Sequence, residues 1–98
     1  MTMANATDMI DAFCDHLWLQ DGLATSSLAS YRRDLNAWAA WLGTRGMLAA
    51  DRGDVEGWLA DQFRAKSKAT SVARRLSTLR RFYRLTNARK LAHIQRTA

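Results

Sequence analysis

The strongest constraint on the fold of this chain is a helical repeat of apolar residues that recurs in four successive segments. Within each segment the apolar side chains stand three and four positions apart, a spacing that gathers them on one face of an α-helix. No segment alternates apolar and polar residues as a β-strand does, and proline is absent from the 98 residues. The pattern predicts an all-α fold, a small orthogonal bundle of four helices or of four to five.

Capping residues and glycines set the limits of the predicted helices. We expect the first three helices to end near Leu19, Thr44 and Ala65, and the fourth to continue to about Thr86. The expected caps are Thr7, Thr25 or Ser26, Asp51 or Asp54, and Thr70. The expected inward residues are Ile10, Phe13, Cys14 and Leu17, then Leu28, Tyr31, Leu35, Trp38 and Leu42, then Val55, Trp58, Leu59 and Phe63, then Val72, Leu76, Leu79 and Tyr83.

Two further side-chain types bear on the core. The tryptophans are expected to build it, with Trp41 half exposed, because Trp38 and Trp58 lie on apolar faces. Arg80 falls near the inward face of the fourth helix, so we expect it in an internal ion pair. Residues 1–86 are predicted to form one helical domain, and residues 87–98 to extend the last helix, to fray, or to pack on another copy.

Charge divides the chain more sharply than apolar pattern does. All nine acidic residues lie at or before Asp61, beside four basic ones, whereas the remaining 37 residues hold eleven Lys or Arg and no acid. The front part therefore carries −5 and the back part +11, which gives the formal net charge of +6. Such asymmetry indicates a polyanionic partner, and a merely solvated basic face is the alternative.

Several classes of function lack their residues. Cys14 is the only cysteine, so an internal disulfide is excluded, and with the distant His16 and His93 it makes no zinc set. No Gly-rich phosphate loop and no paired nucleophile and base are present. We expect no cofactor, no metal, no small-molecule substrate and no independent catalysis. Without a membrane-length apolar run or a signal peptide, the chain is expected to be cytoplasmic.

The fourth helix combines its apolar face with cations and hydroxyls on the other side. Guanidinium groups bond phosphate oxygens strongly, and hydroxyls near helix starts add donors where the helix dipole favours anions. The small residues opposite the apolar face of the second helix permit close approach to a phosphate backbone or to a neighbouring helix. The predicted DNA-binding residues are Thr25, Ser26, Ser30 and Arg33 in the second helix, and Lys68, Thr70, Ser71, Arg74, Thr78 and Arg81 in the fourth, with Arg75 on its flank.

The segments LWLQDGLATSSLASYRRDLNAWAAWL and KATSVARRLSTLRRFYR carry a resemblance to a known family. From about Ile10 to Tyr83 the chain resembles the N-terminal core-binding, SAM-like domain of Xer-type tyrosine recombinases and phage integrases. The resemblance implies a four- or five-helix domain that forms half of a C-shaped clamp around duplex DNA. It also implies that a second, larger domain carries the tyrosine nucleophile, so Tyr31 and Tyr83, both on apolar faces, are not expected to fill that role.

These observations lead to two hypotheses. The first is a DNA-binding arm of a site-specific tyrosine recombinase, which grips duplex DNA through its second and fourth helices and has no catalysis of its own. Removal of Arg74 or Arg81 is then expected to weaken DNA binding and to reduce its salt dependence. The second is a helical protein-interaction or oligomerisation module without DNA binding. Self-association or contact with other recombinase protomers is compatible with both.

Overall fold

The part of the protein that the structure describes is an all-α domain built from four α-helices. The structure, a computed structural model, describes residues 6–97, and the side chains of residues 6–86. Its α-helices are α1 (Ala6–His16), α2 (Thr25–Leu42), α3 (Arg52–Arg64) and α4 (Ala69–Thr97). A π-helical turn, Leu17–Asp21, follows α1, and two 3₁₀ turns, Gly43–Arg45 and Met47–Ala49, lie between α2 and α3. No strand occurs in the described part, so the predicted all-α class is confirmed.

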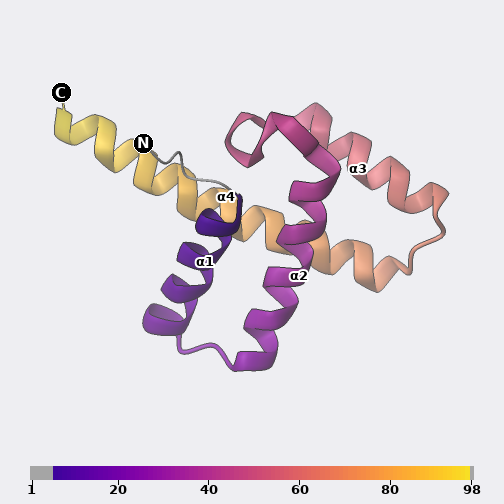
Figure 1. Ribbon diagram of the computed structural model, residues 1–98, viewed down its shortest axis with the longest axis horizontal. Coiled ribbons are helices and arrows are strands. Elements are labelled where there is room, and N and C mark those ends of the chain that lie inside the picture. The colour runs from indigo at the N-terminus through magenta and orange to yellow at the C-terminus, as the bar shows by residue number, and fades with distance from the viewer. Residues whose placement is uncertain (1–5, 98) are drawn as a thin grey trace.

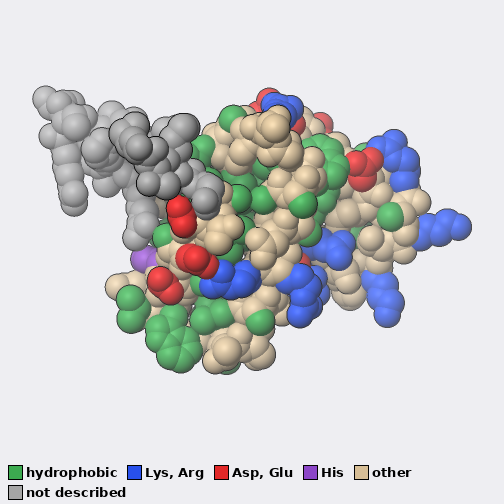
Figure 2. All heavy atoms as spheres, in the orientation of Figure 1, with side chains coloured by type: hydrophobic (Ala, Val, Ile, Leu, Met, Phe, Trp, Pro, Cys, Tyr) green, Lys and Arg blue, Asp and Glu red, His purple; other side chains and the backbone are tan. Residues whose placement is uncertain are grey.

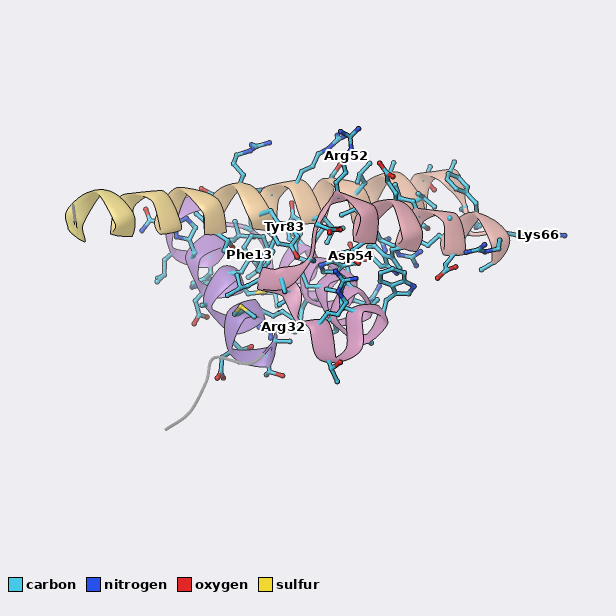
Figure 3. The ribbon with its side chains drawn as sticks, turned by 90° about the horizontal axis from the view of Figure 1, so that it is seen from above. Phe13, Arg32, Arg52, Asp54, Lys66 and Tyr83 are labelled. Carbon is cyan, nitrogen blue, oxygen red and sulfur yellow. The ribbon has the colours of Figure 1, made fainter. Side chains whose placement is uncertain are left out.

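The helices form two layers that cross. In Figure 1, α1 and α2 lie side by side in front, α3 lies beyond the upper end of α2, and α4 crosses behind α1 and α2. Figure 3 shows the same arrangement from above, with α4 as a straight rod along one side of the other helices. The helix α4 continues without a break to Thr97. None of the helices in the described residues is long and apolar enough to cross a membrane.

The core lies where α4 meets the other helices. Phe82 of α4 packs edge-on against Phe13 of α1, with ring centroids 5.4 Å apart. Trp38 of α2 packs against Trp58 of α3, with centroids 5.1 Å apart. The hydroxyl of Tyr83 accepts a hydrogen bond from the Trp38 indole at 2.9 Å and donates one to a backbone carbonyl at 2.6 Å. The inward faces predicted for the first two helices are confirmed by burial of all or part of each residue.

The caps agree with the prediction at one helix start and differ at three. The helix α1 already begins at Ala6, so the predicted cap Thr7 lies inside it. Asp51 caps α3, because its carboxylate accepts from the Asp54 backbone N–H at 3.0 Å while the Asp54 carboxylate accepts from the Asp51 N–H at 2.9 Å. The N-cap of α2 is Ala24, which has no side chain to offer, so the predicted Thr25 or Ser26 cap is wrong. The helix α4 begins at Ala69, one residue before the predicted cap Thr70.

Three predicted side-chain positions are also wrong. Phe63 is 65% exposed, and Gln62 occupies the inward position instead, because the buried face of α3 repeats every four residues. Arg80 is exposed, whereas Phe82 is 2% exposed, because α4 packs against α1 as well as α2 and its buried face is wider than one apolar stripe. Trp18 is 54% exposed and lies in the π-helical turn after α1.

Candidate nucleic-acid interface

The helices α2 and α4 are joined by a buried carboxylate. Asp34 of α2 is 2% exposed and accepts three hydrogen bonds from α4. The Nε–H and Nη2–H of Arg74 donate to its two oxygens at 3.1 and 2.8 Å, and the Thr78 hydroxyl donates at 3.1 Å. The hydrogen bond to Asp34 raises the pKa of Arg74 above its ordinary value. Because each oxygen of Asp34 is bonded, its burial costs little and the crossing point of the two helices is fixed.

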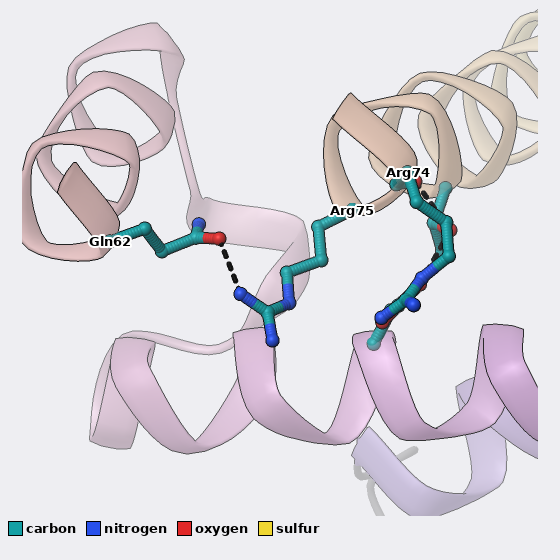
Figure 4. Close-up of polar contacts among 5 residues, drawn as sticks. Gln62, Arg74 and Arg75 are labelled. Carbon is teal, nitrogen blue, oxygen red and sulfur yellow. Dashed lines mark hydrogen bonds and ion pairs between the residues drawn. The ribbon is translucent and has the colours of Figure 1, made fainter. Parts of the chain in front are cut away.

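Two more arginines of α4 bond to other elements. Arg75 donates from Nη1 to Oε1 of Gln62 in α3 at 2.7 Å, and Figure 4 shows it turned toward α3 while its neighbour Arg74 reaches down to α2. Arg81 donates to the Tyr31 hydroxyl at 3.1 Å and forms an ion pair with Asp21. These contacts tie α4 to α2, to α3 and to the turn after α1. We call Arg74, Arg75 and Arg81 the tied arginines.

This bonding bears directly on the predicted DNA-binding set. Thr78 is 1% exposed and its hydroxyl is bonded to Asp34, so this predicted DNA contact lies inside the domain and is already bonded there. The sequence misled because Thr78 is polar, whereas its position on α4 faces α2. The side chains of Arg74 and Arg81 are 44% and 37% exposed, so both reach the surface although each already holds an internal partner.

The remaining predicted residues fall into separate places. Ser30 and Arg74 line one hollow between α2 and α4. Thr25 and Arg33 line a groove on the other side of α2, toward α1. Exposed positions are held by Thr25, Ser26, Arg33, Lys68 and Thr70, and half-buried ones by Ser30, Ser71 and Arg75. The structure thus brings part of the set together at the α2–α4 crossing and spreads the rest along both helices.

Ion pairing separates the cations of the domain into two groups. Six arginines pair with an acid: Arg32 with Asp11, Arg45 with Asp54, Arg52 with Glu56, Arg64 with Asp61, Arg74 with Asp34, and Arg81 with Asp21. Arg75 has no acidic partner but bonds to Gln62. Among residues 6–86, five further cations have neither an acidic partner nor a side-chain hydrogen bond, and we call them the unpaired cations. They are Arg33, Lys66, Lys68, Arg80 and Arg84. All five are exposed, and four of them lie in α4 or in the turn before it.

The unpaired cations give the domain its electrostatic polarity. Figure 2 shows Lys and Arg side chains over α2, over the start of α4 and at the α3–α4 connection, and a cluster of Asp and Glu side chains over α1. Lys66 adopts a left-handed backbone conformation, φ 59°, and Figure 3 shows its side chain pointing away from the body of the domain. The DNA-binding set predicted from the sequence does not include Lys66, Arg80 and Arg84. The charge count placed them in the cationic segment after Asp61, but it could not separate them from Arg64, Arg74 and Arg81, which pair with acids.

The described part of the chain contains neither a metal-binding cluster nor a reactive thiol. No group of three or more His, Cys, Asp or Glu residues there could hold a metal ion. Cys14 is buried, and burial raises the pKa of its thiol, which disfavours the reactive thiolate.

A family model described as phage integrase, N-terminal SAM-like domain, matches residues 10–90. The chain belongs to this family. The match begins at a core residue of α1 and covers α2, α3 and the part of α4 that packs in the core. The crossing of α2 and α4 at Asp34 and every tied arginine lie within it.

Curated relatives of this family member are tyrosine recombinases. The XerD recombinase of Ralstonia nicotianae is 43% identical over 82 residues, which are 81% of this chain and 26% of that protein. Those of Proteus mirabilis and Yersinia pestis are 41% and 40% identical, over 85% and 92% of this chain and 27% and 31% of theirs. The chain therefore spans between about a quarter and a third of the length of these relatives. No solved structure gives a significant match.

Proposed function

We propose that this domain is a DNA-binding arm of a site-specific tyrosine recombinase, which holds duplex DNA through α2 and α4 and leaves the chemistry to another domain. Duplex DNA is the partner, and other recombinase protomers are expected beside it. The observation that carries the proposal is the set of unpaired cations on α2, on α4 and in the turn before α4.

The pairing of charges within the domain explains why these five side chains contribute most to the proposed attraction of DNA. Each of the six arginine–acid pairs is neutral as a whole, so its field weakens quickly with distance. An unpaired, exposed Lys or Arg keeps its full charge and can displace a counterion from a phosphate. Four of the five lie in residues 66–84, so the attraction is directed toward one helix and its preceding turn.

Hydroxyl groups supply the short-range part of the proposed contact. Ser26 is exposed in the first turn of α2, and Thr70 is exposed in the first turn of α4. Side chains of this kind, together with backbone N–H groups at helix starts, are common donors to DNA phosphates. Such contacts fix position and do not read bases, so the domain alone is expected to bind with little sequence preference.

Titration of a fluorescently labelled duplex with the 98-residue protein tests the proposal. Anisotropy is expected to rise at low salt, with a dissociation constant of roughly 10⁻⁴–10⁻⁶ M at physiological salt. The logarithm of the affinity is expected to fall linearly with the logarithm of the salt concentration, because binding releases counterions. A flat anisotropy at low salt, for a protein whose helical circular dichroism is intact, contradicts the proposal.

A protein-interaction module is the second candidate, and exposed apolar side chains favour it. Leu19 is 74% exposed beside Trp18 in the π-helical turn, and Phe63 is 65% exposed at the end of α3. Large apolar groups that remain exposed are frequent at protein contacts. Sedimentation of the protein alone and with duplex separates the candidates. A module without DNA binding self-associates or stays monomeric and never sediments with the duplex.

A further inference from the structure

The hollow between α2 and α4 has the chemistry of an anion site. It is lined by Ser27, Ser30 and Tyr31 of α2 and by Arg74 and Ser77 of α4, with Asp34 and Thr78 at its base. Its volume is about 280 Å³, and because one water occupies about 30 Å³ it has room for a phosphate group with its first waters. The hydroxyls of Ser27, Ser30 and Ser77 make no hydrogen bond within the described residues. They are therefore available as donors to a ligand.

Arg74 enters this hollow with two of its five N–H donors already bonded. A guanidinium has five N–H groups on two usable edges. Asp34 takes one edge, through Nε–H and one Nη2–H. The other edge, formed by Nη1 and the second Nη2–H, makes no hydrogen bond in the described structure, and the side chain is 44% exposed. A guanidinium edge with two parallel N–H groups matches two oxygens of a phosphate.

We propose that this hollow is a subsite for one backbone phosphate of the duplex, in which Asp34 positions Arg74 and the serine hydroxyls complete the donor set. The inference rests on the proposed function. It adds the location of one phosphate contact, the guanidinium edge that makes it, and the residue that positions that guanidinium. Asp34 holds the guanidinium plane at both Nε and Nη2, so binding of the phosphate requires no ordering of a long side chain. The carboxylate of Asp34 accepts three hydrogen bonds, and the residue is only 2% exposed. Both features limit its repulsion of the incoming phosphate.

A substitution that fills the hollow tests the subsite without a change of charge. Ser77→Met places a longer apolar side chain in the hollow, and Ala73→Met, one turn earlier on the exposed face of α4, is the matched control. We expect Ser77→Met to weaken duplex binding by about tenfold at low salt, the loss of one bidentate charged contact, and Ala73→Met to bind as the wild type does. Circular dichroism checks that both variants fold.

A second pair of variants tests the geometry of the guanidinium. Arg74→Lys keeps the charge and removes the second edge, so affinity is expected to fall by about tenfold while the salt slope stays the same. Arg45→Lys is the matched control, because Arg45 also pairs with a nearly buried carboxylate, that of Asp54, away from the hollow. Its affinity is expected to equal that of the wild type.

Nuclear magnetic resonance of ¹⁵N-labelled protein with a mixed-sequence duplex locates the contact. The backbone amides of Ser30 and Ser77 and the Nε–H of Arg74 are expected to shift on binding, and to shift less in Arg74→Lys. If the duplex binds while these signals stay in place, or if Ser77→Met binds as tightly as Ala73→Met, the subsite is overturned and the proposed function stands. If no duplex binds at low salt, the proposed function fails and the subsite with it.

Discussion

Arg80 and Arg81 are neighbours in α4, yet their surroundings are opposite. Arg81 points toward α2, where its guanidinium bonds the Tyr31 hydroxyl and pairs with Asp21. Arg80 is exposed and has no acidic partner among residues 6–86. The tied arginines hold the domain together, while the unpaired cations give it its outward charge. A basic residue in a basic segment is therefore informative about a polyanion only once its internal partners are known.

The largest effect on stability is expected from the carboxylate on which two α4 side chains depend. Asp34→Ala leaves the guanidinium of Arg74 and the buried hydroxyl of Thr78 without their acceptor, which is expected to lower the free energy of unfolding by about 2 kcal/mol. Urea denaturation measures the change. Asp15→Ala, an exposed carboxylate on α1, is the control and is expected to change stability by less than about 0.5 kcal/mol. Equal losses of stability in the two variants would contradict the claim that Asp34 stabilises the fold through its bonds to α4.

A smaller loss is expected when only the hydroxyl is removed. Thr78→Val keeps the shape of a buried side chain and deletes one of the three hydrogen bonds to Asp34, which is expected to cost about 1 kcal/mol. Because Thr78 is 1% exposed, duplex binding and its salt slope are expected to stay unchanged. A reduced affinity with unchanged stability would show that Thr78 contacts DNA after all.

Arg81→Gln is expected to cost less again, about 0.5 to 1 kcal/mol, because its ion pair with Asp21 is exposed in part. The variant also loses the contact of the guanidinium with the Tyr31 ring, whose centroid lies 5.7 Å away. Thermal unfolding with and without 1 M salt measures the two parts, since salt screens the ion pair. Addition of salt is expected to narrow the difference between variant and wild type. A difference that grows with salt contradicts an electrostatic role.

The smallest effect concerns acid stability at α3. Asp61 accepts a hydrogen bond from the Trp41 indole at 2.6 Å and pairs with Arg64, and the two contacts hold the pKa of its carboxyl below the ordinary range. A carboxyl whose pKa is lowered in the folded state stabilises the fold at pH values above its ordinary pKa. This stabilisation is lost as the pH falls below about 4 and the carboxylate is protonated. Asp61→Asn is therefore expected to show a shallower loss of stability on acidification. Parallel pH profiles for the two proteins would contradict it.

The sequence was sufficient for the class of fold and for most of the core, because a spacing of three and four residues depends only on helix geometry. It failed where one helix touches two neighbours. The predicted apolar stripe of α4 omitted Phe82, which packs against Phe13 of α1, and the prediction placed Arg80 near the buried face although its side chain is exposed.

The sequence pattern could not predict which acidic residue each arginine pairs with. Asp34 and Arg74 are forty residues apart in the chain, and only the crossing of α2 and α4 brings them together. The sequence therefore located the cationic segment, but it did not show that Thr78 within that segment is buried against α2. The unpaired cations were hidden by the same limit, because a charge count does not say which charges are cancelled.

A comparison of salt slopes between two double variants tests the division of cations most directly. Arg33→Gln with Lys68→Gln removes two unpaired cations, and Arg45→Gln with Arg52→Gln removes the same charge from two arginines that pair with acids. If each unpaired cation contacts one phosphate, the slope of log affinity against log salt is expected to become shallower by about 0.9 per residue, or about two units, in the first variant. In the second it is expected to stay within error of the wild type. Equal changes in the two variants, or no change in the first, would contradict the account.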